Sequence, residues 1–139
     1  MIDKNIIYRK AEAARKSLER LRSKSGLTQE QFLSDESAQD TVLHHLQIAI
    51  QACIDIGQHL ISDEGWGMPG TLSEIAYILE DHGVISAEQT TSIVGMFGFR
   101  NILVHDYIEV DLKKVYQIWN SKLNDIETYL QAVFTCFGI

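Results

Sequence analysis

The chain has 139 residues, of which 45% are hydrophobic and 22% are charged, and its formal net charge is −7. This length suits a single domain over 1–139 with its own core, and the composition excludes a disordered chain. The acidic balance excludes a protein that coats nucleic acid through a broad basic surface, so any nucleic-acid chemistry must be local. Neither a signal-peptide core nor a membrane-spanning run is present, which predicts a soluble, cytoplasmic protein that does not bind membranes.

Three helices are predicted in the first half of the chain. Asp3 can cap a helix that ends near Ser23, because apolar residues recur along it every three or four positions. Thr28 and Gln31 resemble a capping box for a short helical turn. From about 37 to 62 the apolar stripe is wide, which predicts a central helix packed on more than one side.

Two further helices are predicted before residue 105. Residues 62–70 concentrate Gly and Pro and form a loop, after which a shorter helix covers about 71–82. A second capping box begins at Ser86 and opens a helix that runs towards 104. Gly95 and Gly98 weaken this helix by about 1 kcal/mol each relative to Ala, so they predict a close approach by a neighbouring backbone.

The last predicted helix begins after Asp111 and holds its apolar period for about seven turns, to Phe137. No strand pattern competes with these helices. The predicted fold class is therefore all-α, a bundle of four long helices plus one or two short ones. The two cysteines, Cys53 and Cys136, fall on apolar stripes and are expected to be buried, reduced thiols.

The most informative segment is the octapeptide R-N-I-L-V-H-D-Y at 100–107. On an ideal helix, five steps place His105 about 140° round from Arg100, and fraying of the helix end can bring the pair together. Cations also suit the C-terminal end of a helix dipole. The residues alone therefore leave open whether this pair is catalytic or only stabilises a helix end.

A resemblance to a known family adds to this pattern. Arg, four residues, His, any residue and Tyr resembles the signature of HEPN-superfamily ribonucleases, and GFRNILVHDY before an acid-capped helix is similar to HepT-like ribonuclease toxins. The segments H-H-L-Q-I-A-I-Q-A-C-I-D-I at 44–56 and G-W-G-M-P-G at 65–70 also resemble this family. The resemblance implies a HEPN-like bundle, a cofactor-free and metal-independent endoribonuclease, a homodimer, and an antitoxin from the minimal nucleotidyltransferase family.

The residue types suit RNA cleavage without metal. The 2′-OH acts as nucleophile, which requires one group to take its proton, another to protonate the leaving 5′-oxygen, and a cation for the phosphorane. His105 can serve as base or acid, whereas Arg100 stays charged and can clamp phosphate oxygens. Because one such histidine per chain is one acid–base group short, a two-fold dimer that joins both octapeptides is expected.

Two neighbours of His105 have alternative roles. Asp106 can raise the pKa of His105 or orient Arg100, or it can be an ordinary exposed carboxylate at a helix end. Tyr107 can cap the core with its ring and bond through its hydroxyl. The resemblance implies instead that Tyr107 accepts AMP groups from the nucleotidyltransferase antitoxin, whose phosphates would compete with RNA.

A polar line follows the central helix at steps of three or four residues. It contains His44, Gln47, Gln51, Asp55 and His59. Asp55 and His59 could hold a metal, although two ligands without a paired Glu-x-x-His motif are a weak basis for that site. The favoured interpretation is that Gln47, Gln51 and Asp55 support the catalytic pair, together with Asn101 beside Arg100.

The sequence therefore predicts an endoribonuclease toxin that cuts tRNA or mRNA at a composite site in a homodimer. The expected catalytic residues are Arg100 and His105, and the resemblance implies an antitoxin that neutralises the protein by AMPylating Tyr107. A non-catalytic helical dimer that binds a nucleotide or a partner is the alternative. A metal-dependent hydrolase is a third class, held back by its missing ligands.

Overall fold

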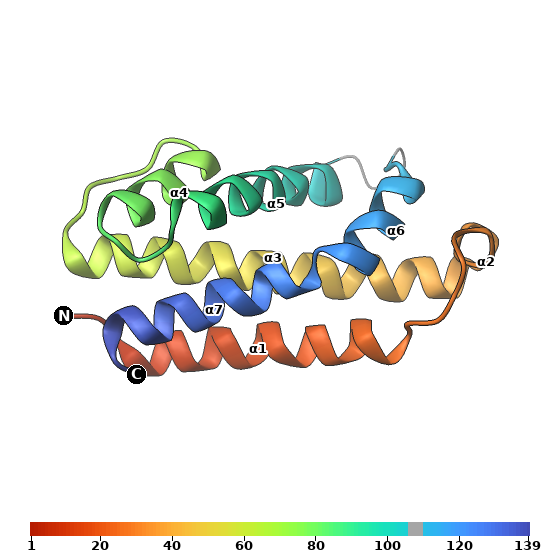
Figure 1. Cartoon of the computed structure of the whole chain (residues 1–139), viewed down its shortest axis with the longest axis horizontal. Helices are drawn as coiled ribbons and strands as arrows, with labels where there is room; N and C mark the ends of the chain where they lie inside the picture. Colours follow the sequence, from red (N-terminus) through yellow and green to blue (C-terminus); the bar gives the residue numbers. More distant parts are fainter. Residues whose placement is uncertain (106–109) are drawn as a thin grey trace.

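The computed structural model describes residues 1–105 and 110–139, and side chains for 1–103 and 110–139. These residues form seven helices, which are α1 (Lys4–Ser23), α2 (Gln29–Leu33), α3 (Glu36–Glu64), α4 (Leu72–Asp81), α5 (Ala87–His105), α6 (Leu112–Ser121) and α7 (Leu123–Phe137) (Figure 1). The predicted all-α class is confirmed, and four of the helices are long. In the part of the chain that is described, no helix is long and apolar enough to cross a membrane.

The helix starts follow the capping residues that the sequence indicates. The Asp3 carboxylate accepts hydrogen bonds from two backbone N–H groups of α1, and Asp111 does the same for α6. Thr28 forms the predicted capping box at α2. Ser86 and Gln89 exchange hydrogen bonds of 2.8 and 3.2 Å at the start of α5. These contacts satisfy N–H groups that the first turn of a helix leaves unpaired.

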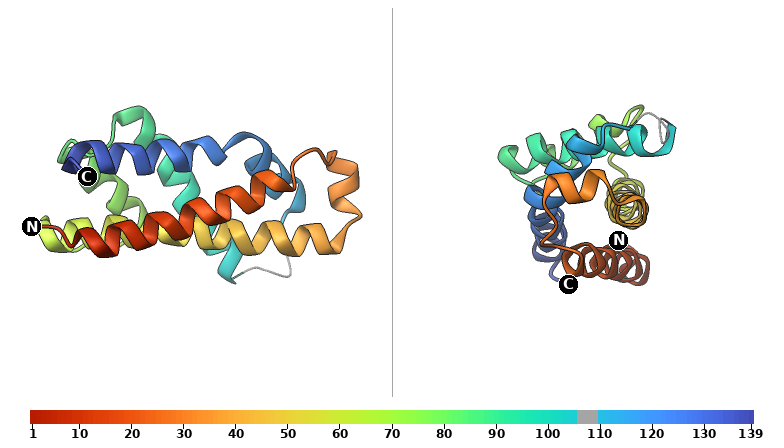
Figure 2. Two further views of the ribbon diagram at one scale, coloured as in Figure 1. Left: turned by 90° about the horizontal axis from the view of Figure 1, so that it is seen from below. Right: turned by 90° about the vertical axis from the view of Figure 1, so that its right-hand side faces the viewer.

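Helix α3 is the centre of the bundle and contacts every other helix. It lies antiparallel to α1 on one side and to α5 on another, while α7 lies alongside and returns the chain to the end where it began (Figures 1 and 2). Twelve of its residues are buried, from Val42 to Ile61, which agrees with its wide apolar stripe. Cys53 is among them, whereas Cys136 is exposed, so the prediction of a second buried thiol was wrong.

The predicted single helix over 112–137 is instead broken at Lys122, where α6 ends and α7 begins. The break lets α6 pack on α2 while α7 follows α3 and α5. Trp119 donates from Nε1 to the Leu21 carbonyl at 2.8 Å, and its ring lies 5.4 Å from that of Phe32. A straight helix could not satisfy both sets of contacts, and tertiary packing therefore sets the bend.

The close approach predicted at Gly95 and Gly98 is found at another glycine. A Cβ on either residue would meet no described atom within 4 Å, so neither makes room for a described neighbour. A Cβ on Gly57 of α3 would lie 2.6 Å from Ile75 Cγ2 and 3.2 Å from Tyr129 Oη. Gly57 is therefore the residue that lets α4 and α7 pack closely against α3.

We expect Gly57→Ala to lower the free energy of unfolding by roughly 1 kcal/mol, because the cost of overpacking exceeds the gain in helix propensity. Gly98→Ala is the matched control and should raise it by about 1 kcal/mol, since its methyl group enters open space. Urea unfolding at one fixed protein concentration measures both. Equal shifts in the same direction would contradict this account of Gly57.

Candidate active site

Arg100 lies in the last part of α5, and its side chain turns towards α3. The guanidinium Nε donates to Gln51 Oε1 at 2.7 Å, and Nη1 donates to Asn101 Oδ1 at 3.3 Å. The side chain is half-buried. Two amide oxygens thus hold the guanidinium without neutralising it, which leaves its positive charge available to an anion.

A hydrogen-bonded chain continues from Arg100 across α3 to α1. Gln51 Nε2 donates to Asp55 Oδ1 at 2.9 Å, and Lys10 Nζ lies 3.0 Å from Asp55 Oδ2. A carboxylate only accepts, so Asp55 holds the Gln51 amide with its nitrogen towards itself and its oxygen towards Arg100. The position of Arg100 therefore depends on residues of three helices.

A groove of about 340 Å³ lies between α1 and α3, beside the hydrogen-bonded side chains of Gln51, Asp55 and Lys10. Its lining consists of Lys10, Ala13, His44, Gln47, Ile48, Gln51, Ala52 and Asp55. Most of the predicted polar line of α3 thus borders one groove. Within it, the Gln47 side chain makes no hydrogen bond to a described residue, so its amide is available to a ligand. The groove offers an ammonium group, amides and an exposed imidazole, which are groups that can bind phosphate and polar base edges.

His45 lies next to this groove but faces α1. Its Nδ1 lies 3.2 Å from Ser17 Oγ. Burial lowers the pKa of His45, and the neighbouring His44 and Arg20 lower it further. Protonation of His45 is therefore disfavoured near neutral pH, and the Ser17 contact joins α1 to α3.

Helix α5 is helical through His105, so the chain does not fray between Arg100 and His105. The two Cα atoms are then separated by about 7.5 Å along the axis and about 140° around it. Fraying within this segment was an expectation that the structure contradicts. In a single chain, the backbone thus sets the two residues on different faces of α5.

The remaining predicted site residues are only partly covered. The His105 side chain, Asp106 and Tyr107 lie outside the described side chains. His59 is half-buried on α3, one turn after Asp55. Among the residues that are described, no group of three His, Cys, Asp or Glu side chains could hold a metal ion. Both oxygens of Asp55 are already bound by Gln51 and Lys10.

Sequence reasoning missed Lys10. It contacts Asp55 over a separation of 45 residues, and nothing local distinguishes it from the other basic residues of α1. The spacing of Gln51 and Asp55 did place them on one face of α3, because residues four apart are neighbours on a helix.

Comparisons with known proteins agree with this fold. The family described as "Ribonuclease HepT-like" matches residues 14–133. The mRNA nuclease HepT of Shewanella oneidensis is 30% identical over 93% of this chain and 96% of its own length. The tRNA nuclease HepT of Aphanizomenon flos-aquae is 26% identical over 95% of this chain and 90% of its own.

A solved structure is similar over nearly the whole chain. It is described as a tri-AMPylated Shewanella oneidensis HEPN toxin in complex with MNT antitoxin. It superposes with a TM-score of 0.85 and 30% identity, covering 97% of this chain and 99% of that one. The matches confirm the HEPN and HepT-like resemblance and the ribonuclease class that this resemblance implied.

Proposed function

The chain belongs to the ribonuclease HepT-like family, and on this premise we propose that it is the RNA-cleaving toxin of a toxin–antitoxin pair. The observation that carries the proposal is the half-buried Arg100, held by amide oxygens on the helix that ends at His105. A cation without a carboxylate partner among its described contacts suits a phosphate ligand. Relatives named as mRNA and tRNA nucleases support RNA as the substrate.

The proposed reaction needs no metal ion. The 2′-oxygen of the substrate attacks the adjacent phosphorus, and one His105 takes the 2′-OH proton. The bond from phosphorus to the 5′-oxygen breaks, a second His105 protonates that oxygen, and a 2′,3′-cyclic phosphate remains. Arg100 binds the non-bridging oxygens, whose charge is greatest in the transition state.

A homodimer supplies the second histidine. The helical path from Arg100 to His105 separates the two around α5 by about 140°, so one copy is poorly arranged to surround a phosphate by itself. A two-fold axis near the end of α5 would join two copies of each residue in one cleft. The cleft would also concentrate positive charge on an acidic protein.

We further propose that a minimal nucleotidyltransferase antitoxin switches the enzyme off at Tyr107. The phenol oxygen attacks the α-phosphorus of ATP, pyrophosphate leaves, and the phenol proton passes to solvent. The solved complex of an AMPylated HEPN toxin with an MNT antitoxin supports this type of partner. The attached phosphodiester would place negative charge next to Arg100 and His105.

We expect purified protein to cleave RNA at full rate in excess EDTA and to leave 2′,3′-cyclic phosphate or 3′-phosphate ends. The reason is that the proposed chemistry uses only Arg and His side chains. Mass spectrometry of the fragments identifies the ends. Loss of cleavage in EDTA with recovery on adding a divalent metal would contradict the proposal and favour a metal site at Asp55 and His59.

Gln51→Ala should slow cleavage by about 10- to 100-fold, because a hydrogen bond to a charged group contributes roughly 1.5–3 kcal/mol. The loss should fall on kcat more than on KM, since Arg100 would still attract RNA but would be poorly oriented for the transition state. Gln58→Ala is the matched control, an exposed glutamine on the same helix. If the two variants cleave alike, Gln51 does not position Arg100.

A further inference from the structure

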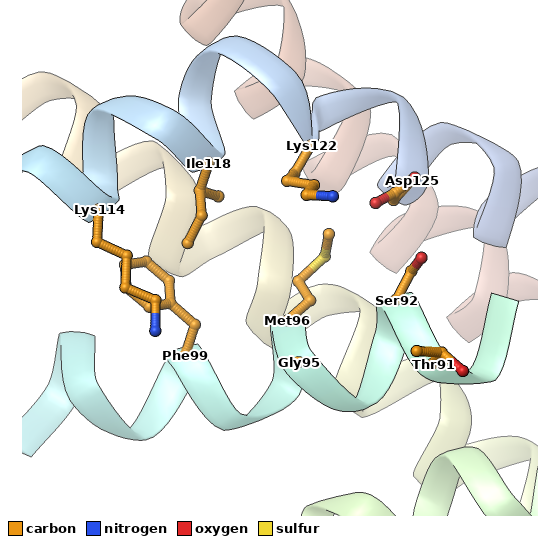
Figure 3. Close-up of a pocket in the computed structure, with 9 residues that line it drawn as sticks. All are labelled: Thr91, Ser92, Gly95, Met96, Phe99, Lys114, Ile118, Lys122 and Asp125. Atoms are coloured by element: carbon orange, nitrogen blue, oxygen red, sulfur yellow. The ribbon is translucent and has the colours of Figure 1, made fainter. Parts of the chain in front are cut away.

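A second cavity, of about 330 Å³, lies between α5 and the α6–α7 segment (Figure 3). Its lining consists of Thr91, Ser92, Gly95, Met96, Phe99, Lys114, Ile118, Lys122 and Asp125. The volume falls in the range of small-molecule sites, about 300–1,000 Å³. None of these residues takes part in the Arg100 network.

The cavity has an ordered chemical lining. Figure 3 shows Lys114 beside Phe99 at one end, Met96 and Ile118 between, and Ser92 with Lys122 and Asp125 towards the other. Met96 and Phe99 are buried, so they form an apolar floor. A ligand that fits must therefore be apolar in its middle, anionic at one end and polar at the other.

The two lysines lack anionic partners in the described part of the chain. Neither Lys114 nor Lys122 forms an ion pair there, and both side chains are exposed. An ammonium group without a partner beside an apolar floor is a ready binding group for phosphate. Asp125 and the Ser92 hydroxyl can instead accept hydrogen bonds from N–H groups.

Gly95 forms part of the wall. It is exposed, and a Cβ there would meet no described atom within 4 Å. A glycine inside a helix carries a cost in stability relative to Ala, and no described contact explains it here. Its missing side chain keeps the cavity open.

We propose that this cavity binds one nucleotide of the RNA substrate, flanking the bond that is cleaved. The base lies on Met96 and Ile118, its phosphate contacts Lys114, and its edge donates to Asp125. Guanine suits the acceptor end best, because its edge carries adjacent N–H donors. The assignment of this nucleotide to an RNA substrate rests on the proposed function, whereas the nucleotide-binding site is inferred from the cavity alone.

The position of the cavity along α5 agrees with a nucleotide site next to the cleaved bond. Phe99 directly precedes Arg100, and Gly95 lies about 7.5 Å before Arg100 along the helix axis. The basic end of the cavity is thus the end towards the proposed catalytic residues. A strand whose phosphate is held by Arg100 could cross the exposed face of α5 and place a neighbouring base in the cavity.

Binding can be read from Met96 without interference. The chain has three methionines, and Met1 and Met68 are almost fully exposed, at 103% and 95%, whereas Met96 is 6% exposed. Full-length Arg100→Ala protein, labelled at the methionine methyl groups, would be titrated with the four nucleoside monophosphates and with inorganic phosphate. We expect GMP to shift the Met96 signal most, and phosphate to leave it unchanged.

A matched pair of variants tests the location. Gly95→Leu should fill the cavity and weaken GMP binding at least tenfold, while Gly98→Leu, one turn further along α5, should bind as before. Lys114→Gln should weaken it by a similar factor. Circular dichroism checks the fold, and light scattering checks the assembly. If both glycine variants lose binding and also change the molecular mass, this face is an interface between copies and the proposal is wrong.

Cleavage assays decide whether the nucleotide that binds in the cavity is part of the RNA substrate or a free nucleotide. With active protein and RNAs varied one base at a time, we expect a preference for G at one position flanking the cut, which Gly95→Leu loses and Gly98→Leu keeps. A Met96 shift with GMP but unchanged base preference in Gly95→Leu would overturn the substrate assignment. An unmoved Met96 signal with every nucleotide would overturn the site, while normal cleavage by the wild type would leave the proposed function standing.

Discussion

Arg100→Ala and His105→Ala are each expected to end growth arrest and to slow RNA cleavage by at least about 100-fold. Removal of a group that stabilises transition-state charge costs about 100- to 1,000-fold, and removal of an acid–base group about 100- to 10,000-fold. Single-turnover cleavage of labelled RNA measures the rates, and induced expression without the antitoxin measures growth.

Two further variants make this result specific. Arg22→Ala removes an exposed positive charge from the end of α1 and should leave cleavage unchanged. Arg100→Lys keeps the charge but loses the planar fork and the Nε bond to Gln51, so its activity should be lower than that of the wild type. Folded alanine variants that still arrest growth would refute the assignment of both residues.

The helix starts were predictable because their causes are local. Asp3, Thr28, Ser86 and Asp111 each bind N–H groups within three residues, and such contacts follow from the sequence without any tertiary structure. The wide stripe of 37–62 likewise identified the central helix, since a helix apolar on several faces must be covered on several sides.

The bend at Lys122 was not predictable from periodicity. Val115, Trp119, Leu123 and Ile126 continue a spacing of three or four residues straight through it, and Lys122 makes no side-chain cap. The cause lies in distant partners, above all the Leu21 carbonyl that accepts from Trp119. A period records which residues are buried but not the direction in which each turn must face.

In the candidate site, too, contacts within one helix were predictable, whereas contacts between helices were not. Gln51 and Asp55 were identified from spacing within one helix, whereas Lys10 joins them only because α1 packs on α3. The approach of a second copy leaves no periodic signal in one chain. The need for it comes from chemistry, since one His105 cannot take a proton and donate another at the same moment.

Modification of Tyr107 is also expected to have a large effect on RNA cleavage. Incubation of the wild-type protein with its nucleotidyltransferase partner and ATP should add adenylate-sized mass increments and abolish RNA cleavage. Tyr107→Phe deletes only the acceptor oxygen, so it should gain no increment and should stay active in the presence of the partner. Intact-mass measurement and cleavage assays on the same samples report both effects.

The direction of this switch follows from electrostatics. Each added phosphodiester brings negative charge and bulk two residues from His105, where the RNA phosphate must bind, so RNA affinity should fall together with turnover. Raising the salt concentration should not restore binding, because the attached group also fills the cleft. Tyr107→Phe assayed without the partner serves as the control, and its cleavage shows whether the hydroxyl also takes part in the reaction. Adenylate increments that persist undiminished on Tyr107→Phe would place the acceptor on another residue.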